Sequence, residues 1–159
     1  MSRVDAVTFR HALARFPSGV TVVTVRDDGG RDYGMTVSAF ASLSLDPPLV
    51  LVCIGDDATI AGAVAAAGHF AVSVLSEEQE AIARRFAEQD ADRFAGMKVS
   101  RGADGIALID GAAAHLECTI VARHRGGDHT IVVGEVNAAR AAEDGRPLVY
   151  QRGMYTRLR

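Results

Sequence analysis

Residues 34–48 read Gly-Met-Thr-Val-Ser-Ala-Phe-Ala-Ser-Leu-Ser-Leu-Asp-Pro-Pro, and the apolar run Leu-Val-Leu-Val-Cys-Ile follows directly at 49–54. The hydroxyl residues Thr36, Ser38 and Ser42 stand among apolar residues, in a segment that we expect to be extended. The edge of such a strand can offer backbone donors and hydroxyls to a planar ligand with a polar rim. An ordinary strand whose Thr and Ser side chains face water explains the same pattern, so both interpretations stay open.

The segments on either side also favour strands. Residues 20–25 are rich in Val and Thr, which suits a strand. Asp and Gly at 27–30 predict a tight turn, so residues 33–40 should return as a second strand and complete a hairpin. The continuous apolar run at 49–54 predicts a strand that is covered on both faces.

Further along the chain we expect strands at 70–75, 116–122 and 129–138, and an extended piece at 147–158. Helical spacing appears in three places. The first is the apolar stripe Phe9, Ala12, Leu13 and Phe16, and the second is residues 60–67, which an Asp or Thr would cap. The third helix follows the capping-box pair Ser76 and Gln79, with an inner face of Ile82, Ala83 and Phe86. Residues 87–96 are charged, and we expect a mobile segment there.

Strands therefore dominate, and most are joined by short turns. This pattern predicts a mainly β fold with inserted helices, arranged as a closed or nearly closed antiparallel barrel. A regular β-α-β alternation, which would indicate a parallel sheet, is missing from the pattern. The chain has 159 residues, so we expect one domain over 1–159.

Composition argues against several classes of function. The net charge is −3 and no basic stripe is present, so a nucleic-acid partner is not expected. The apolar runs are too short to span a bilayer, and the N-terminus lacks the apolar core of a signal peptide, so we expect a cytoplasmic protein without a membrane partner. Cys53 and Cys118 fit small buried residues without a disulfide. No spacing of His and Cys predicts a metal site.

Motifs for nucleophilic catalysis and for phosphate-binding loops are equally missing. A triad of Ser38, His129 and Asp128 can be written on paper, but nothing local positions its members. His129 stands out only because it follows the turn at 125–128 and begins a strand. A turn histidine that bonds a nearby carbonyl group is the structural alternative to a ligand-binding role.

Several motifs, taken in order, resemble one family. They are Gly-Asp-His at 127–129 followed by Gly-Glu-Val at 134–136, Gly-Met-Thr-Val-Ser-Ala-Phe at 34–40, and Ser-Leu-Ser-Leu-Asp-Pro-Pro-Leu-Val at 42–50. With the segments 9–24 and 150–155, they extend over nearly the whole chain. This combination resembles the short-chain NAD(P)H:flavin oxidoreductases, the reductase components of two-component monooxygenases.

The resemblance implies an FMN-binding split β-barrel, a Greek-key-like antiparallel barrel that forms a homodimer with flavin sites near the subunit interface. It implies hydride transfer from NADH or NADPH to FMN or FAD, which then reaches a partner monooxygenase by diffusion. The residues that match the family's flavin-binding segments, with Ser42 added from the opening stretch, are Met35, Thr36, Val37, Ser38, Ser42, Val52, Cys53, Ile54, Gly55, Thr59, Phe86 and Ala87. His129 and Tyr150 match its contacts to the nicotinamide dinucleotide.

Two departures from the family pattern affect the predicted flavin contacts. Ser38 stands where the family often has Asn, and both residues can donate a hydrogen bond. Asp56 and Asp57 stand beside the predicted helix start near 57–60, where unpaired N–H groups would face a phosphate, and their charge opposes an anion. Arg85 or Arg93 could supply positive charge to that phosphate.

Hydride transfer between two cofactors needs no nucleophile from the protein, which fits the missing catalytic motifs. The alternative is a module of the same barrel fold that holds FMN tightly for electron transfer or sensing, without turning over free NADH. A relative of the pyridoxamine-phosphate oxidases is a third interpretation, and the Gly-Asp-His turn argues against it. The sequence leaves open NADH against NADPH, FMN against FAD and the partner's substrate, although Arg123, Arg125 and Arg152 are candidates for a 2′-phosphate contact.

Overall fold

The computed structural model describes residues 3–89 and 92–159, and strands account for most of its regular structure. In chain order the elements are α1 Ala6–Leu13, β1 Ser18–Gly19, β2 Thr21–Arg26, β3 Asp32–Val37, β4 Phe40–Leu45, β5 Pro48–Gly55, α2 Ala61–Ala66, β6 His69–Val74, α3 Glu80–Ala87, β7 Val99–Arg101, β8 Ala107–Ile109, β9 Ala114–Gly126, β10 His129–Ala141, β11 Val149–Gln151 and β12 Met154–Thr156. The mainly β class predicted from the sequence is confirmed.

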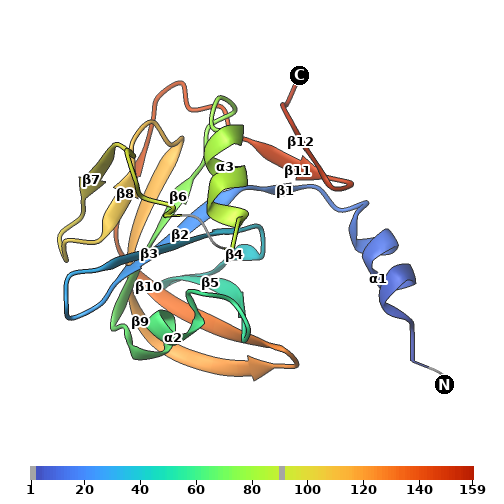
Figure 1. The fold of residues 1–159 in the computed structure, drawn as a ribbon, viewed down its shortest axis with the longest axis horizontal. Coiled ribbons are helices and arrows are strands. Elements are labelled where there is room, and N and C mark those ends of the chain that lie inside the picture. The colour runs from blue at the N-terminus through green and yellow to red at the C-terminus, as the bar shows by residue number, and fades with distance from the viewer. Residues whose placement is uncertain (1–2, 90–91) are drawn as a thin grey trace.

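The main sheet has seven strands in the order β3-β2-β6-β9-β10-β5-β4, and every neighbouring pair is antiparallel. The sheet curls round its own core (Figure 1), and the chain crosses from β3 at one edge to β4 at the other through Ser38 and Ala39. The N–H of Cys53 on β5 donates to the carbonyl of Ala39 at 3.0 Å. This bond joins the crossing to β5, the strand next to the far edge of the sheet.

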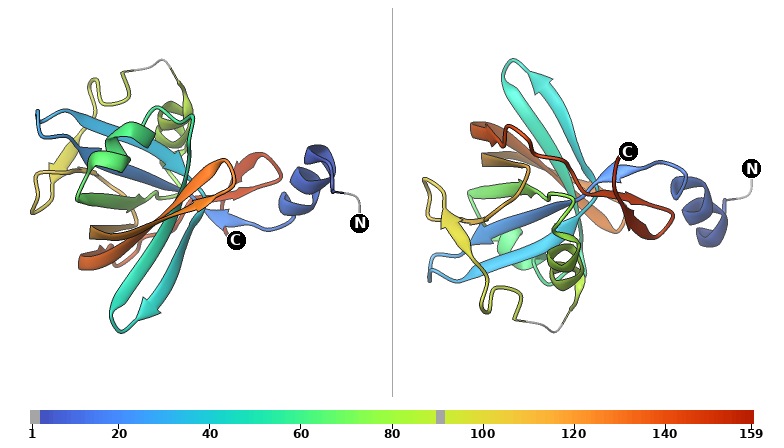
Figure 2. Two further views of the ribbon diagram at one scale, coloured as in Figure 1. Left: turned by 90° about the horizontal axis from the view of Figure 1, so that it is seen from below. Right: turned by 90° about the horizontal axis from the view of Figure 1, so that it is seen from above.

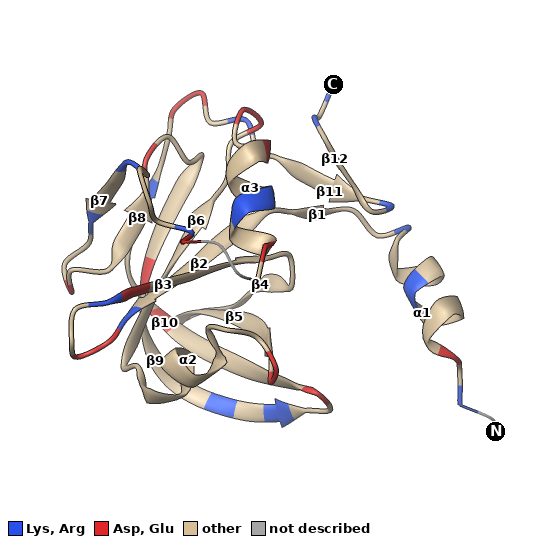
Figure 3. Ribbon diagram, in the orientation of Figure 1, with Lys and Arg blue, Asp and Glu red and all other residues tan. Residues whose placement is uncertain are grey.

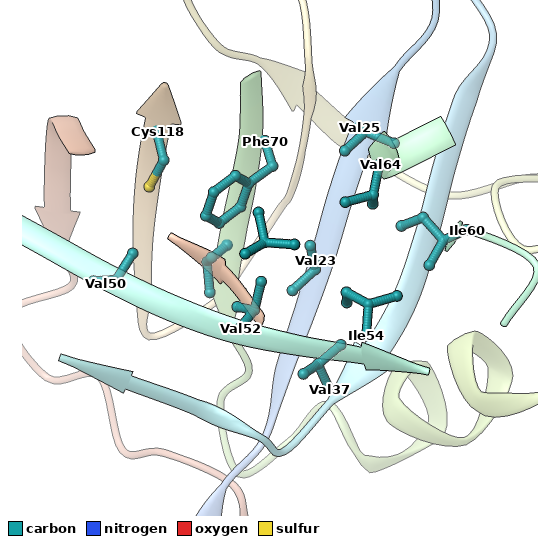
Figure 4. Close-up of a cluster of buried hydrophobic side chains, with 12 residues drawn as sticks. Val23, Val25, Val37, Val50, Val52, Ile54, Ile60, Val64, Phe70 and Cys118 are labelled. Atoms are coloured by element: carbon teal, nitrogen blue, oxygen red, sulfur yellow. The ribbon is translucent and has the colours of Figure 1, made fainter. Parts of the chain in front are cut away.

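The barrel core is built by the inward side chains of these strands. Along β5, Val50, Val52 and Ile54 are buried while the residues between them are partly exposed, which is the period of two of a strand. Figure 4 shows these three side chains gathered with Phe70 and Cys118, among others, in one cluster. Full burial of one such aliphatic side chain is worth about 1.5–3 kcal/mol, so this cluster is a main source of stability.

A second buried cluster lies where α3 packs on the sheet, and it includes Phe86, Ala83 and Leu75. The predicted inner face of this helix is therefore confirmed for Ala83 and Phe86, and Ile82 packs against the cluster as a partly buried residue. Ile109, on the small β7–β8 hairpin, completes the cluster from a segment that sequence reasoning did not assign.

Several expectations from the sequence need correction. Strand β5, predicted to be covered on both faces, is buried on one face only, and the piece predicted as extended over 147–158 contains the hairpin of β11 and β12. The segment predicted as one strand over 33–40 bends after Val37, and Ser42 belongs to the separate strand β4. The start of α2 at Ile60 has no side-chain cap, so the predicted Asp or Thr cap is wrong. The side chain of Gln79 does accept from the Ser76 N–H at 3.0 Å, as the capping box predicts, although α3 begins only at Glu80.

Helix α1 lies apart from the barrel in all three views (Figures 1 and 2). None of its residues is buried, and its apolar stripe is open, with Phe9 54%, Leu13 52% and the following Phe16 77% exposed. The C-terminal hairpin ties the end of this arm to the body, because the Arg152 N–H donates to the Ala14 carbonyl at 3.1 Å. No helix in the described part of the chain combines the length and apolarity needed to cross a membrane.

Candidate functional site

A groove of about 830 Å³ lies between the α1 arm, the β3–β4 crossing, the outer face of β5 and the β11–β12 hairpin. Of the predicted site residues, Ser38, Cys53 and Tyr150 line it. They come from three segments that are far apart in the sequence. Apolar side chains such as Phe40 and Leu51 form much of its surface. This is the mixture of apolar floor and few polar groups that small-molecule sites use.

The floor of the groove continues along β5 toward β10. Cys53 and Gly55 point outward on β5, and their partners across the ladder are Ile131 and His129. Residues directly opposite in an antiparallel pair share a face, so His129 lies on the same face as Cys53, one step along. The side chains of Val52 and Ile54 point the other way and are 1% and 2% exposed. Those two residues can therefore meet a ligand only through their backbone.

One edge of β3 is open. β2 pairs with one side of β3, and no strand in the described ranges pairs with the other. The Gly34 carbonyl on this open edge accepts from Arg93 Nη1 at 2.6 Å. Alternate residues of a strand direct their backbone groups to the same edge, so the N–H and carbonyl of Thr36 also face outward there. The Thr36 hydroxyl donates to the Ala83 carbonyl at 2.7 Å, and Val37 is buried in the core.

The open edge joins the groove to a second cavity of about 670 Å³, which Gly34, Thr59 and Arg93 line. Ser38 lines the groove at one end of the edge, and Gly34 lines the cavity at the other. An extended chain covers about 13 Å between these two positions. A ligand with a planar ring at one end and a phosphate at the other could therefore lie along this edge, with Thr59 near its phosphate.

The wall behind Gly34 is tightly packed. A Cβ at Gly34 would lie 2.7 Å from Phe86 Cε1 and 3.0 Å from Phe94 Cζ. The Phe86 and Phe94 rings pack edge to face, with centroids 5.1 Å apart. Phe86 is fully buried, so its side chain supports the wall, whereas Ala87 at the end of α3 is exposed.

Arg93 was predicted only as a possible source of charge for the phosphate, and its bond to the β3 edge was not predicted. Its side chain is 9% exposed, and its guanidinium donates to the carbonyls of Gly34 and Glu88. Burial lowers the pKa of this guanidinium below its ordinary value, yet arginine keeps its charge in proteins. Arg85 is committed in a similar way to the carbonyls of Asp92 and Ala95. Both candidate phosphate ligands thus already bond to the protein backbone.

The N-terminal end of α2 is also less available than predicted. The N–H groups of Ala58 and Ala61 donate to the carbonyls of Gly55 and Ala58 at 3.0 and 2.9 Å. These two bonds do not involve the N–H groups of Thr59 and Ile60, so those groups and the exposed Thr59 hydroxyl stay the predicted phosphate contacts. Ser42, exposed on β4 opposite Val50, lines neither the groove nor the second cavity.

His129 begins β10 directly after the turn of Gly127 and Asp128. Its Nδ1 lies 2.8 Å from Asp128 Oδ1, and this bond lowers the pKa of the Asp128 carboxyl. The other ring nitrogen lies toward Gly55, since a Cβ there would be 3.7 Å from His129 Nε2. The Asp128 bond holds the ring in a fixed direction, although half of the His129 side chain remains open to solvent.

The three arginines considered for a 2′-phosphate differ in position. Arg123 donates to the Val64 and Ala67 carbonyls near the end of α2, and Arg125 lies 3.7 Å from the Asp56 carboxylate. Arg152 lines the groove together with Tyr150. Tyr150 is 36% exposed, and its ring packs 5.3 Å from that of Tyr155. Of the three, Arg152 is the one placed beside the predicted nicotinamide contact.

The family profile described as "Flavin reductase like domain" matches residues 13–159. The chain belongs to this family. The reductase component of 4-hydroxyphenylacetate 3-monooxygenase from Thermus thermophilus is 45% identical over 154 residues, which cover 94% of this chain and 95% of the relative. A Streptomyces coelicolor protein named actinorhodin polyketide dimerase is 45% identical over 146 residues, covering 92% of this chain and 82% of the relative.

Solved structures agree with this membership. The NADH:FAD oxidoreductase of Streptomyces globisporus C-1027, solved in complex with NAD and FAD fragments, has a TM-score of 0.93 at 42% identity, covering 100% of this chain and 98% of that one. The resemblance drawn from the sequence is therefore confirmed, as is the split β-barrel.

Proposed function

We propose that this flavin reductase family member is an NAD(P)H-dependent flavin reductase that supplies reduced FMN or FAD to a partner monooxygenase. The observation that carries the proposal is the open edge of β3, which joins an apolar groove to a second cavity in a chain of this family. When bound, flavin supplies the acceptor for a hydride from the nicotinamide, so the protein's task is to bind and orient the two molecules.

The residues along the edge fit a flavin. The outward N–H and carbonyl of Thr36 suit the polar rim of the ring, and the exposed Ser38 can add a hydroxyl. Cys53 and the β3–β4 crossing offer the apolar face on which a ring can stack. Thr59 would hold the phosphate in the second cavity. The groove and cavity volumes of about 830 and 670 Å³ lie in the usual range for cofactor sites.

His129 lines neither the groove nor the second cavity, but from the continuation of the groove floor along β5 and β10 it would orient the nicotinamide. It shares the outer face of β5 and β10 with Cys53, so a nicotinamide beside it would lie against a ring stacked on Cys53. Tyr150 and Arg152 would contact the remainder of the dinucleotide from the C-terminal hairpin. Both nicotinamides stay within the proposal, and the named activity of the Streptomyces globisporus relative favours NADH.

Partnership with a monooxygenase is supported by the relative from Thermus thermophilus, which is named as a reductase component. Reduced flavin that passes to a second protein by diffusion must leave its first site readily. We therefore expect a flavin dissociation constant near micromolar, about −8 kcal/mol in binding free energy, rather than permanent retention.

A homodimer is part of the proposal. The apolar stripe of α1 with Phe16 is open to solvent in one copy of the chain, although α1 forms one side of the groove. A connected apolar surface of this kind marks an interaction site, and a second copy burying it would close the groove.

Light scattering should give twice the chain mass for the wild type, and the double variant Leu13→Glu with Phe16→Glu should be a monomer. A wild-type monomer at micromolar concentration would contradict this part.

The cytoplasm remains the proposed location. Cys53 and Cys118 are both free thiols, and the buried Cys118 contributes to the core as a reduced side chain. Free thiols of this kind suit a reducing compartment.

The activity is tested by mixing the purified protein with NADH or NADPH and with FMN or FAD, while absorbance at the NADH band is followed. Oxidation that depends on both the protein and the flavin is the expected result. Absence of oxidation in all four combinations would refute the enzyme. A yellow protein that keeps its flavin through dialysis and is not bleached by NADH would instead support the tight FMN-binding alternative.

A further inference from the structure

The turn that carries His129 reaches beyond the barrel, and its tip has little packing of its own. A Cβ at Gly127 would meet no atom within 4 Å, and the Asp128 side chain is 94% exposed. The turn is a two-residue connection between β9 and β10, because Gly126 pairs with His129. A tip without apolar contacts needs polar contacts at its base to stay in one position.

Asp56, just beyond the end of β5, makes those contacts. Its N–H donates to the Asp128 carbonyl at 3.0 Å, one step past the last paired residues, Gly55 and His129. Its carboxylate accepts from the Thr130 hydroxyl at 3.1 Å and lies 3.7 Å from the Arg125 guanidinium. Thr130 follows the turn on β10 and Arg125 precedes it on β9. Asp56 therefore contacts both strands that flank the turn. Figure 3 shows basic positions near the end of β9 beside acidic positions on the β5–α2 connection.

We propose that Asp56 is a positioning residue for His129: by holding both strands at the turn, it fixes the imidazole ring over the face of Gly55 and Cys53. The proposal rests on the flavin reductase function argued above. It also explains a carboxylate, three residues before Thr59 in the sequence, whose charge would only oppose a bound phosphate. We call the first role, in which Asp56 holds the two strands at the turn, a clamp. A clamp and an opposing charge predict different effects of the same substitutions on the KM for NADH and on flavin affinity.

The variants that separate the two roles are Asp56→Ala, Asp56→Asn and Thr130→Val. Asp56→Ala removes both side-chain contacts, and Thr130→Val removes the hydroxyl while keeping a β-branched side chain. Asp56→Asn removes the charge but keeps an oxygen that can accept from Thr130. Asp144→Asn, in an exposed turn away from both cavities, is the matched control.

A clamp predicts that Asp56→Ala and Thr130→Val raise the KM for NADH about three- to tenfold, the loss of one net hydrogen bond. The KM of Asp56→Asn should stay within about twofold of wild type. The KM of the double variant, Asp56→Ala with Thr130→Val, should not exceed that of the worse single variant by more than about twofold. Flavin affinity should not change in any of these variants. If Asp56→Ala and Asp56→Asn instead tighten flavin binding equally and leave the KM unchanged, the charge acts alone and the clamp is wrong.

A second readout does not depend on turnover. In protein with ¹⁵N-labelled histidine, the two ring nitrogens of His129 report its tautomer and hydrogen bonds. Asp56→Ala should shift these signals toward those of a solvated imidazole, and Asp56→Asn should restore them, with circular dichroism confirming the fold of each variant. Unchanged His129 signals in Asp56→Ala would overturn the proposal. Absence of NADH oxidation by the wild type would refute the enzyme function and leave this readout intact.

Discussion

The two segments proposed to hold flavin and nicotinamide, the open edge of β3 and the turn of His129, are stabilised by different forces. On one side the open edge of β3 stands on packed rings and a buried guanidinium, since Gly34 is in close contact with Phe86 and bonded by Arg93. On the other side the turn of His129 is exposed and is held by polar contacts to Asp56. Surface contacts of that kind are individually worth little. The flavin side should therefore be rigid and costly to change, and the nicotinamide side adjustable at small cost.

The largest effect should come from Gly34→Ala. The added Cβ would lie 2.7 Å from Phe86, and such overpacking costs about 1–3 kcal/mol. We expect a lower free energy of unfolding in urea and a flavin dissociation constant raised at least about tenfold, because the edge itself must move. Gly62→Ala is the control, since its Cβ would meet nothing within 4 Å. A Gly34→Ala protein as stable as the control would show that the wall yields easily.

Arg93→Met should follow in size. The Gly34 carbonyl would lose its buried donor, and an unsatisfied buried acceptor costs about 1–3 kcal/mol. Flavin binding should weaken while the KM for NADH, measured at saturating flavin, stays near wild type. Arg85→Met removes a similar guanidinium whose bonds are solvent-exposed, so its unfolding free energy should change by less than about 1 kcal/mol. Equal losses in the two variants would remove the special role of Arg93.

The turn should tolerate change better than the wall. Gly127 has a φ of +70° but open space around it. Gly127→Ala should cost about 1 kcal/mol through backbone strain alone, and Gly127→Asn should cost less because Asn enters this conformation more readily. Both should raise the KM for NADH only about two- to threefold. A loss of flavin binding in either variant would mean that the two sides are not independent.

Sequence patterns predicted one of these sides better than the other. The Gly-Asp-His turn could be located because its glycines and the alternating strands beside it are local signals. The wall could not, because Arg93 lies in a charged loop typical of solvated residues and bonds a carbonyl 59 positions away. Phe86 was placed both on the inner face of α3 and at the flavin, and full burial leaves its side chain only the first of these positions.

The parts of the fold that the sequence did not predict also depend on contacts between distant segments. Alternation and apolar runs located β2, β5, β6 and the β9–β10 pair. The bend at Ser38 and Ala39 was missed because it depends on the pairing of β4 with β5 at the far edge of the sheet. Of the predicted stripe, Phe9, Ala12 and Leu13 lie on α1 and Phe16 follows its end. A helical pattern does not say what covers such residues, and no residue of α1 is buried in one copy of the chain.

The central claim is that separate segments hold the two molecules, the edge of β3 the flavin and the turn of His129 the nicotinamide, and a crossed measurement with Ser38→Ala and His129→Ala tests it most directly. The flavin dissociation constant and the KM for NADH would be measured for each variant. We predict that Ser38→Ala weakens flavin binding about three- to tenfold with little change in the KM, and that His129→Ala raises the KM by a similar factor without changing flavin affinity. The account would be contradicted if both variants changed the same one of these two constants, or if neither variant changed either constant.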